Sequence, residues 1–108
     1  MKPSDISEVL FKAAKLLEKH GWTRGEYLDK NGSMCAVGAI SAALGKQGAD
    51  SEWDYMLGVP CIKAVEAHLY CGDGTGPVQN LNDWNDEKAK DMREVTDAFR
   101  RTAEALLT

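Results

Sequence analysis

Residues 5–21 read DISEVLFKAAKLLEKHG, and they carry the clearest structural signal in the chain. Their apolar residues recur at steps of three and four, which is typical of one stripe of an amphipathic helix: Ile6, Val9, Leu10, Ala13, Leu16 and Leu17. Asp5 and Glu8 have the spacing of a capping box at the start of this helix. Gly21 ends it, because glycine adopts the left-handed conformation without steric cost.

A second helix is predicted over residues 36–44, a segment of small and apolar residues that Gly45 closes. Gly38 and the alanines of this segment allow a neighbouring element to approach closely. Between the first two helices, Asn31-Gly32 is typical of a hairpin turn, because both residues tolerate positive φ. We therefore expect a short β-hairpin at this point, or at least a tight reversal of the chain.

The second half of the chain indicates three more helical segments. Ser51 is placed to cap a short one, and Pro60 fits the first position of another that runs to about Tyr70. The last helix begins near Asp91, where Asp91 and Glu94 form a second capping-box pair. Its apolar positions again recur at steps of three and four: Met92, Val95, Phe99, Thr102 and Leu106.

These elements predict a mainly α, compact helical bundle that forms a single domain over residues 1–108. The composition, 44% hydrophobic and 28% charged, is typical of a globular protein rather than a disordered one. We expect the core to hold one or two residues from each apolar stripe: Leu10, Leu17, Ile40, Val65, Val95 and Phe99.

Several classes of protein are disfavoured by composition. No apolar run approaches the roughly 20 residues that span a bilayer, so no membrane segment is expected. The start, residues 1–5, lacks the pattern of a signal peptide, and three cysteines suit reduced thiols, so we expect a cytoplasmic protein. The net charge of −4 argues against nucleic acid as a partner. Residues 45–87 carry eight acidic residues against two lysines, while each flanking segment has one more base than acid. This acidic middle fits either a basic partner or a solvated face.

Three short motifs carry a resemblance to a known family. They are Gly21-Trp22, the segment Cys35-Ala36-Val37-Gly38-Ala39-Ile40, and Trp84-Asn85-Asp86 before the last helix. Together they resemble a family of small uncharacterised proteins from actinobacteria and their phages, known only as a domain of unknown function. Residues 87–90 and Asp91 depart from it, since the family pattern has a Pro-Gly loop and a threonine cap there. The resemblance implies a fold and a phage context, and it implies no activity.

Cys35 is the best candidate for a reactive group. It lies at the predicted start of a helix, where the helix dipole lowers a thiol pKa, and His68 with Asn85 or Asp86 would complete a hydrolase set. The apolar neighbours Met34, Val37 and Ile40 oppose this effect, and we expect Cys35 to be buried and slow to react. No metal site is predicted, because His68 and Cys71 form only one ligand pair and zinc needs four ligands.

Trp84-Asn85-Asp86 is the most distinctive tripeptide and has two interpretations. In the first, Trp84 anchors the chain while Asn85 or Asp86 accepts hydrogen bonds from backbone N–H groups of a turn. In the second, Trp22, Trp84, Asn85 and Asp86 line a binding pocket for a small ligand. We favour the structural interpretation of this tripeptide.

The sequence therefore favours a small non-enzymatic binding protein that needs no cofactor. If the phage context holds, it would be phage-encoded and dock on a host or phage protein in the host cytoplasm. Two alternatives remain open: a cysteine-dependent hydrolase that uses Cys35 and His68, and a small-molecule binder that uses the region of Trp22 and Trp84.

Overall fold

The fold is built from five α-helices and one π-helical turn within the described residues. A computed structural model describes residues 2–45, 52–69 and 80–107. The elements follow in this order: α1 (Pro3–His20), α2 (Ala36–Ala43), α3 (Glu52–His68), α4 (Leu81–Asp83), the π-helix η1 (Trp84–Lys88) and α5 (Met92–Leu107). The prediction of a mainly α-helical bundle is confirmed.

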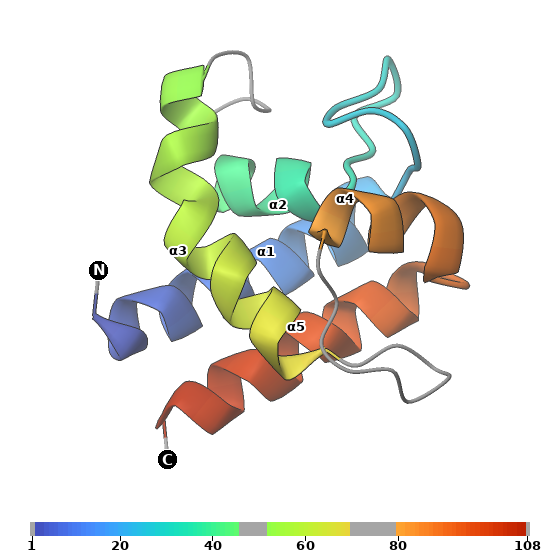
Figure 1. Cartoon of the computed structure of the whole chain (residues 1–108). Coiled ribbons are helices and arrows are strands. Elements are labelled where there is room, and N and C mark those ends of the chain that lie inside the picture. Colours follow the sequence, from blue (N-terminus) through green and yellow to red (C-terminus); the bar gives the residue numbers. More distant parts are fainter. Residues whose placement is uncertain (1, 46–51, 70–79, 108) are drawn as a thin grey trace.

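Helices α1 and α5 form the main packing pair of the bundle. They lie side by side and run in opposite directions, with both chain ends on the same side of the molecule (Figure 1). Ser7 of α1 donates a buried hydrogen bond of 2.8 Å to the carbonyl of Ala103 in α5. At the surface, the guanidinium of Arg100 meets the Glu18 carboxylate at 2.6 and 3.1 Å and holds the pKa of Glu18 below its ordinary value.

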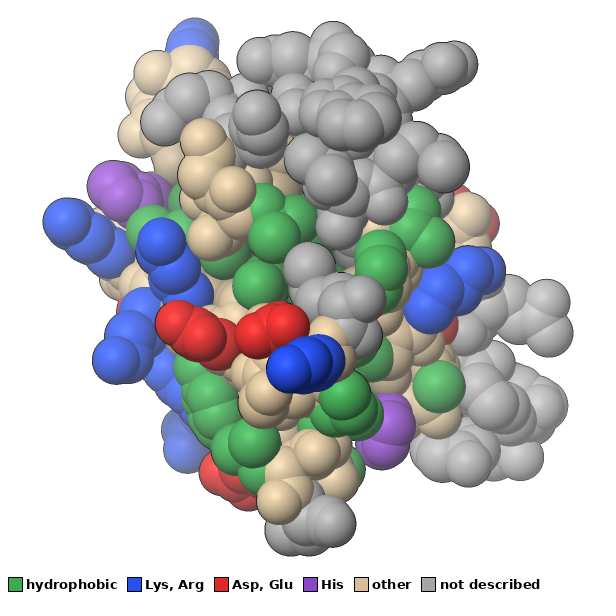
Figure 2. Space-filling model, turned by 90° about the vertical axis from the view of Figure 1, so that its left-hand side faces the viewer, with side chains coloured by type: hydrophobic (Ala, Val, Ile, Leu, Met, Phe, Trp, Pro, Cys, Tyr) green, Lys and Arg blue, Asp and Glu red, His purple; other side chains and the backbone are tan. Residues whose placement is uncertain are grey.

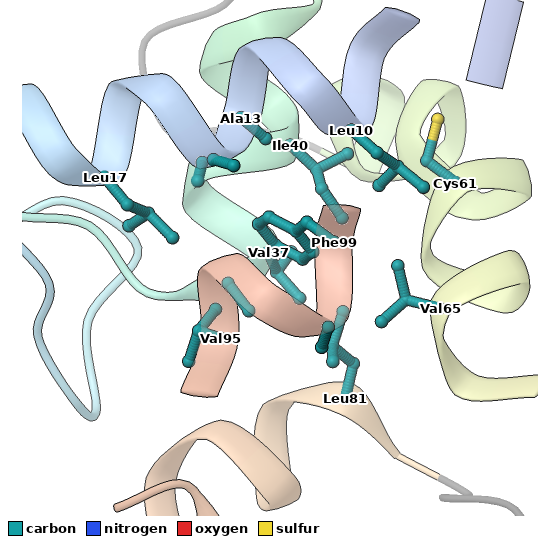
Figure 3. Close-up of a cluster of buried hydrophobic side chains, with 14 of the residues drawn as sticks. Leu10, Ala13, Leu17, Val37, Ile40, Cys61, Val65, Leu81, Val95 and Phe99 are labelled. Carbon is teal, nitrogen blue, oxygen red and sulfur yellow. The ribbon is translucent and has the colours of Figure 1, made fainter. Parts of the chain in front are cut away.

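The core lies where α1, α2, α3 and α5 meet. All six residues that the apolar stripes predicted for it have no exposed surface, and Figure 3 shows them around the ring of Phe99: Leu10, Leu17, Ile40, Val65, Val95 and Phe99. Each helix contributes one stripe, so the cluster joins segments from both ends of the chain. The core prediction is confirmed.

The start of α1 differs from the prediction. The helix begins at Pro3 with Lys2 as its N-cap, so Asp5 lies within the first turn and accepts a 3.3 Å hydrogen bond from the backbone N–H of Lys2. The predicted capping box of Asp5 and Glu8 is therefore wrong. Proline explains the earlier start, because its fixed φ suits the first helical position and its missing N–H would have no partner there.

The chain reverses between α1 and α2 without forming strands. Among the described residues, Met34 makes two isolated bridges, to Trp22 and to Leu28, and the expected β-hairpin is reduced to the tight reversal. Asp29 explains why, since its Oδ1 accepts hydrogen bonds of 2.9 Å from the N–H groups of both Asn31 and Ser33. A side chain that binds these N–H groups competes with strand pairing.

Helix α3 is one continuous element, whereas the sequence predicted two. Pro60 lies inside it rather than at a start, and it is exposed. Proline removes one backbone hydrogen bond, which costs least on the side of a helix that water can reach. On the opposite side, Cys61, Ile62 and Val65 are buried and keep the helix on the core. The predicted cap at Ser51 lies outside the described residues.

The short helix α4 and the turn η1 connect α3 to α5. Glu66 of α3 accepts a 2.8 Å hydrogen bond from the N–H of Leu81, and this bond positions the start of α4. Before α5, Asp91 accepts a 2.9 Å bond from the N–H of Glu94, as predicted. The Glu94 carboxylate bonds the N–H of Lys90, one residue earlier than a standard capping box requires. No helix in the described part of the chain is long and apolar enough to cross a membrane.

Candidate functional site

The turn η1 places the Trp84-Asn85-Asp86 motif against the loop between α1 and α2. Its wide turn closes with a 2.8 Å bond from the N–H of Ala89 to the carbonyl of Trp84. π-Helical turns are rare and are found often at functional sites. Here the turn buries Trp84 and Asn85 together, at 5% and 0% exposure, while Asp86 stays exposed.

Asn85 is the centre of a hydrogen-bond network between distant parts of the chain. Its Oδ1 accepts the indole N–H of Trp22 at 2.7 Å and the backbone N–H of Ala36 at 2.9 Å. Its Nδ2 donates to the carbonyl of Thr23 at 3.2 Å and to the Asp86 carboxylate at 2.9 Å. Because the amide uses both its oxygen and its nitrogen in this way, a buried polar side chain is satisfied without water.

The residues beside Asn85 attach the same loop at two more points. Asp86 Oδ1 accepts the backbone N–H of Gly25 at 2.9 Å. Arg24 donates to the carbonyl of Ala89 at 2.6 Å, and its guanidinium lies 4.7 Å from the centre of the Trp22 ring. We call these contacts, with those of Asn85, the Asn85 network. The prediction that Asn85 or Asp86 accepts backbone N–H groups is confirmed for both.

Cys35 lies at the N-terminus of α2 and is 3% exposed. Its Sγ accepts the N–H of Gly38 at 3.3 Å and so acts as the cap of this helix. Burial raises the pKa of the Cys35 thiol, and the Asp86 carboxylate adds to this, against the opposing N–H groups of Gly38 and Val37. The expected outcome, a buried thiol in which desolvation exceeds the helix-end effect, is confirmed.

His68 is not part of the surroundings of Cys35. It lies near the end of α3, where its Nδ1 is 2.9 Å from the carbonyl of Ala64 in the same helix. It is exposed and is not among the groups that shift the Cys35 pKa. Asn85 approaches the start of α2 but binds the N–H of Ala36 rather than an imidazole. In the described ranges, no group of three His, Cys, Asp or Glu side chains is placed to hold a metal ion, and Cys71 lies outside them.

A small pocket of about 270 Å³ opens beside the Asn85 network. We call it the Cys35 pocket, and these residues line it: Gly25, Glu26, Tyr27, Cys35, Asn82 and Asp86. Of the four predicted binding residues, only Asp86 belongs to its lining. The indole N–H of Trp22 is instead bound to Asn85, and Trp84 is buried.

The comparison with protein families bears on identity. A model described as a family of unknown function, DUF6197, matches residues 1–105. The chain belongs to this family. No curated protein and no solved structure shows significant similarity to this chain.

In this DUF6197 member, the three motifs behind the resemblance meet at one point. Trp22 follows the glycine that ends α1, Ala36 begins α2, and both donate to the oxygen of Asn85. Gly38 of the second motif brings the loop close, since a Cβ there would lie 2.0 Å from the backbone oxygen of Tyr27. Motifs that are far apart in sequence thus form one structural unit.

Sequence reasoning missed part of this region. Arg24, Glu26 and Asn82 were not singled out, although the first stabilises the loop and the other two line the Cys35 pocket. Arg24 and Glu26 flank Gly25 in a polar loop, and neither they nor Asn82 belong to a periodic apolar pattern. These residues could be found only after η1 and the loop had been placed together.

Proposed function

We propose that this DUF6197 protein is a non-enzymatic binding protein that docks on another protein through the loop of residues 24–28 and the adjoining Cys35 pocket. Two neighbouring large side chains of this loop are exposed, Tyr27 at 38% and Leu28 at 42%. Tyrosine is among the residues enriched as anchors of protein interfaces, and apolar neighbours such as Leu28 help to exclude water around such an anchor.

The observation that carries this proposal is the firm attachment of the loop. Asp86 binds the N–H of Gly25, Arg24 binds the carbonyl of Ala89, and the backbone of Tyr27 packs directly on Gly38. A loop that is already held in one conformation loses little entropy when a partner binds to it. The network therefore supports a recognition role for the side chains that the loop presents to solvent.

The charge of the pocket favours a basic group on the partner. Glu26 and Asp86 both line the pocket and are exposed. The hydrogen bonds that Asp86 accepts from described residues end on Oδ1, which leaves Oδ2 for a ligand. A lysine or arginine side chain that enters the pocket would meet two carboxylates, a favourable setting for a cation.

The surroundings of Cys35 favour binding over catalysis. A nucleophilic thiol requires a lowered pKa and a base within reach, whereas the Cys35 thiol has a raised pKa and caps a helix. The finer parts of the proposal are a phage-encoded protein, a host or phage partner, and action in the host cytoplasm. They rest on the motif resemblance alone.

Capture from an actinobacterial lysate tests the proposal when it compares matched bait proteins. One bait carries Glu26→Lys with Leu28→Ser in the loop. Its control carries Glu104→Lys with Ala67→Ser, the same charge change together with a new serine at exposed positions of α5 and α3. We expect the wild type and the control to retain a common partner that the loop variant loses.

Two outcomes contradict the proposal. One is a partner retained equally by the loop variant, and the other is the absence of any partner specific to the folded wild type. Circular dichroism of the loop variant must match the wild type, since both substituted side chains are exposed. A partner that free spermidine displaces would support the predicted cationic group.

A further inference from the structure

A second surface with different chemistry lies where α1 begins and α5 ends. We call it the α1–α5 groove. It has a volume of about 440 Å³, and these residues line it: Ser4, Ser7, Glu8, Phe11, Lys12, Lys15 and Leu107. The groove lies apart from the Asn85 network, since Asn85 is in η1, and none of the residues that line the Cys35 pocket lines this groove.

The floor of the groove is apolar and partly open to solvent. Leu107 is 59% exposed, more than the other large hydrophobic residues that are exposed in the described part of the chain. Phe11, one helical turn after Ser7, is only partly buried against the core. Solvent contact of these side chains has a free-energy cost that a partner would remove by covering them.

Charge on the α1 side of the groove identifies the kind of partner. Lys12 and Lys15 are exposed and line the groove, and among the described residues neither forms an ion pair, although the charge of Lys15 acts on Glu18. Figure 2 shows this end of the molecule, where Lys and Arg side chains gather along one edge beside hydrophobic ones. The groove therefore carries two lysines against one acid, Glu8, in a chain whose net charge is −4.

We propose that the α1–α5 groove binds an acidic amphipathic helix of a second protein. Apolar side chains of that helix cover Phe11 and Leu107, while its carboxylates pair with Lys12 and Lys15. Glu8 lines the same groove one turn before Lys12, so it disfavours acidic groups at that end and sets the direction of the bound helix. This surface is independent of the proposed docking loop.

A designed peptide pair provides the test. The probe is a fluorescein-labelled helical peptide with leucines at positions i, i+4 and i+7 and glutamates beside them; its control has lysines in place of the glutamates. We expect the acidic peptide to raise fluorescence anisotropy in a saturable way and to bind less tightly as salt increases. The basic peptide should bind at least about tenfold more weakly, a difference of about 1.4 kcal/mol.

Variants assign the binding to the groove. Lys12→Glu with Lys15→Glu should weaken the acidic peptide about tenfold, and Leu107→Ser should weaken it independently of salt. The matched control is Lys30→Glu with Lys88→Glu, which makes the same charge change at exposed positions outside the groove. The loop variant Glu26→Lys with Leu28→Ser should bind the peptide normally, so failure here is distinct from failure of the proposed docking loop.

The inference is overturned if the acidic peptide fails to bind, if it binds no better than the basic peptide, or if the lysine variant binds it unchanged. Vesicles of phosphatidylcholine and phosphatidylserine serve as a further probe. Binding to these vesicles without binding to the peptide would assign the groove to a membrane surface instead. Self-association in sedimentation that Leu107→Ser abolishes would assign it to a second copy of the chain.

Discussion

The indole N–H of Trp22 and the side-chain oxygen of Asn85 lie 2.7 Å apart, although the two residues are separated by 63 positions in the chain. The same oxygen binds the first backbone N–H of α2, that of Ala36. A single buried amide therefore joins the end of α1, the start of α2 and the turn η1. This relationship explains how a loop without strands is held against the helical core, and it leads to the first prediction.

Asn85→Ala should destabilise the protein by about 3 kcal/mol, because it leaves the partly buried indole N–H of Trp22 and the buried N–H of Ala36 without an acceptor. Urea denaturation measures this change. Asn82→Ala is the control, since Asn82 is partly buried nearby and its side chain makes no hydrogen bond within the described residues. Equal stability of the two variants would contradict a central role for Asn85.

Gly38→Ala should destabilise the protein, although the same change inside a helix usually adds about 0.5–1 kcal/mol of stability. The added Cβ would lie 2.0 Å from the backbone oxygen of Tyr27, and a backbone group cannot move aside as a flexible side chain can. A thermal unfolding midpoint below that of the wild type checks the sign. A higher midpoint would show that the loop does not pack on α2 as described.

Phe99→Ala should cost about 3–5 kcal/mol, since the ring has no exposed surface and fills the centre of the core. Leu106→Ala, in the same helix but only partly buried, should cost clearly less. Chemical denaturation of both variants gives the comparison. Similar values would mean that α5 does not bury the face that contains Phe99.

Cys35 should react slowly with iodoacetamide in the folded protein. The thiol is 3% exposed and its pKa is raised, so little thiolate exists near neutral pH and the reagent has poor access to it. Peptide-resolved mass spectrometry should find labelling of Cys35 only after urea is added. Fast labelling below pH 7 that His68→Ala abolishes would support the thiol-hydrolase alternative instead.

Stability should fall in alkaline solution. Burial raises the pKa of Cys61 from 9.0 to about 11 and raises that of Cys35 as well. Because the folded-state pKa values lie above the unfolded ones, the contribution of each thiol is complete below pH 9 and is lost as pH rises through the folded values. Cys61→Val should flatten the decline between pH 9 and 11, measured by urea titration at each pH. An unchanged slope would contradict burial of Cys61 as its cause.

Much of the helical framework was predictable, because helical periodicity is a local property. The stripes of α1 and α5 identified core residues such as Leu10 and Phe99 correctly. The local pattern was misleading where burial of other residues in the same helix outweighed it. Pro60 signals a helix start in sequence, yet burial of Cys61 and Val65 on the other side of α3 keeps the helix continuous through it.

What the sequence by itself determined is the helical content, the main core residues and the capping of α5 by Asp91, since each depends on neighbours within a few positions. Only the tertiary structure decided what Trp22, Asn85 and Asp86 do. Their partners lie 49 to 63 positions away, and an amide or carboxylate carries no sign of which distant N–H group it will meet. The Cys35 pocket arises in the same way, because its side chains become neighbours only when η1 meets the loop. In the α1–α5 groove, helical periodicity already aligns six residues on one face of α1, and packing adds only Leu107 of α5.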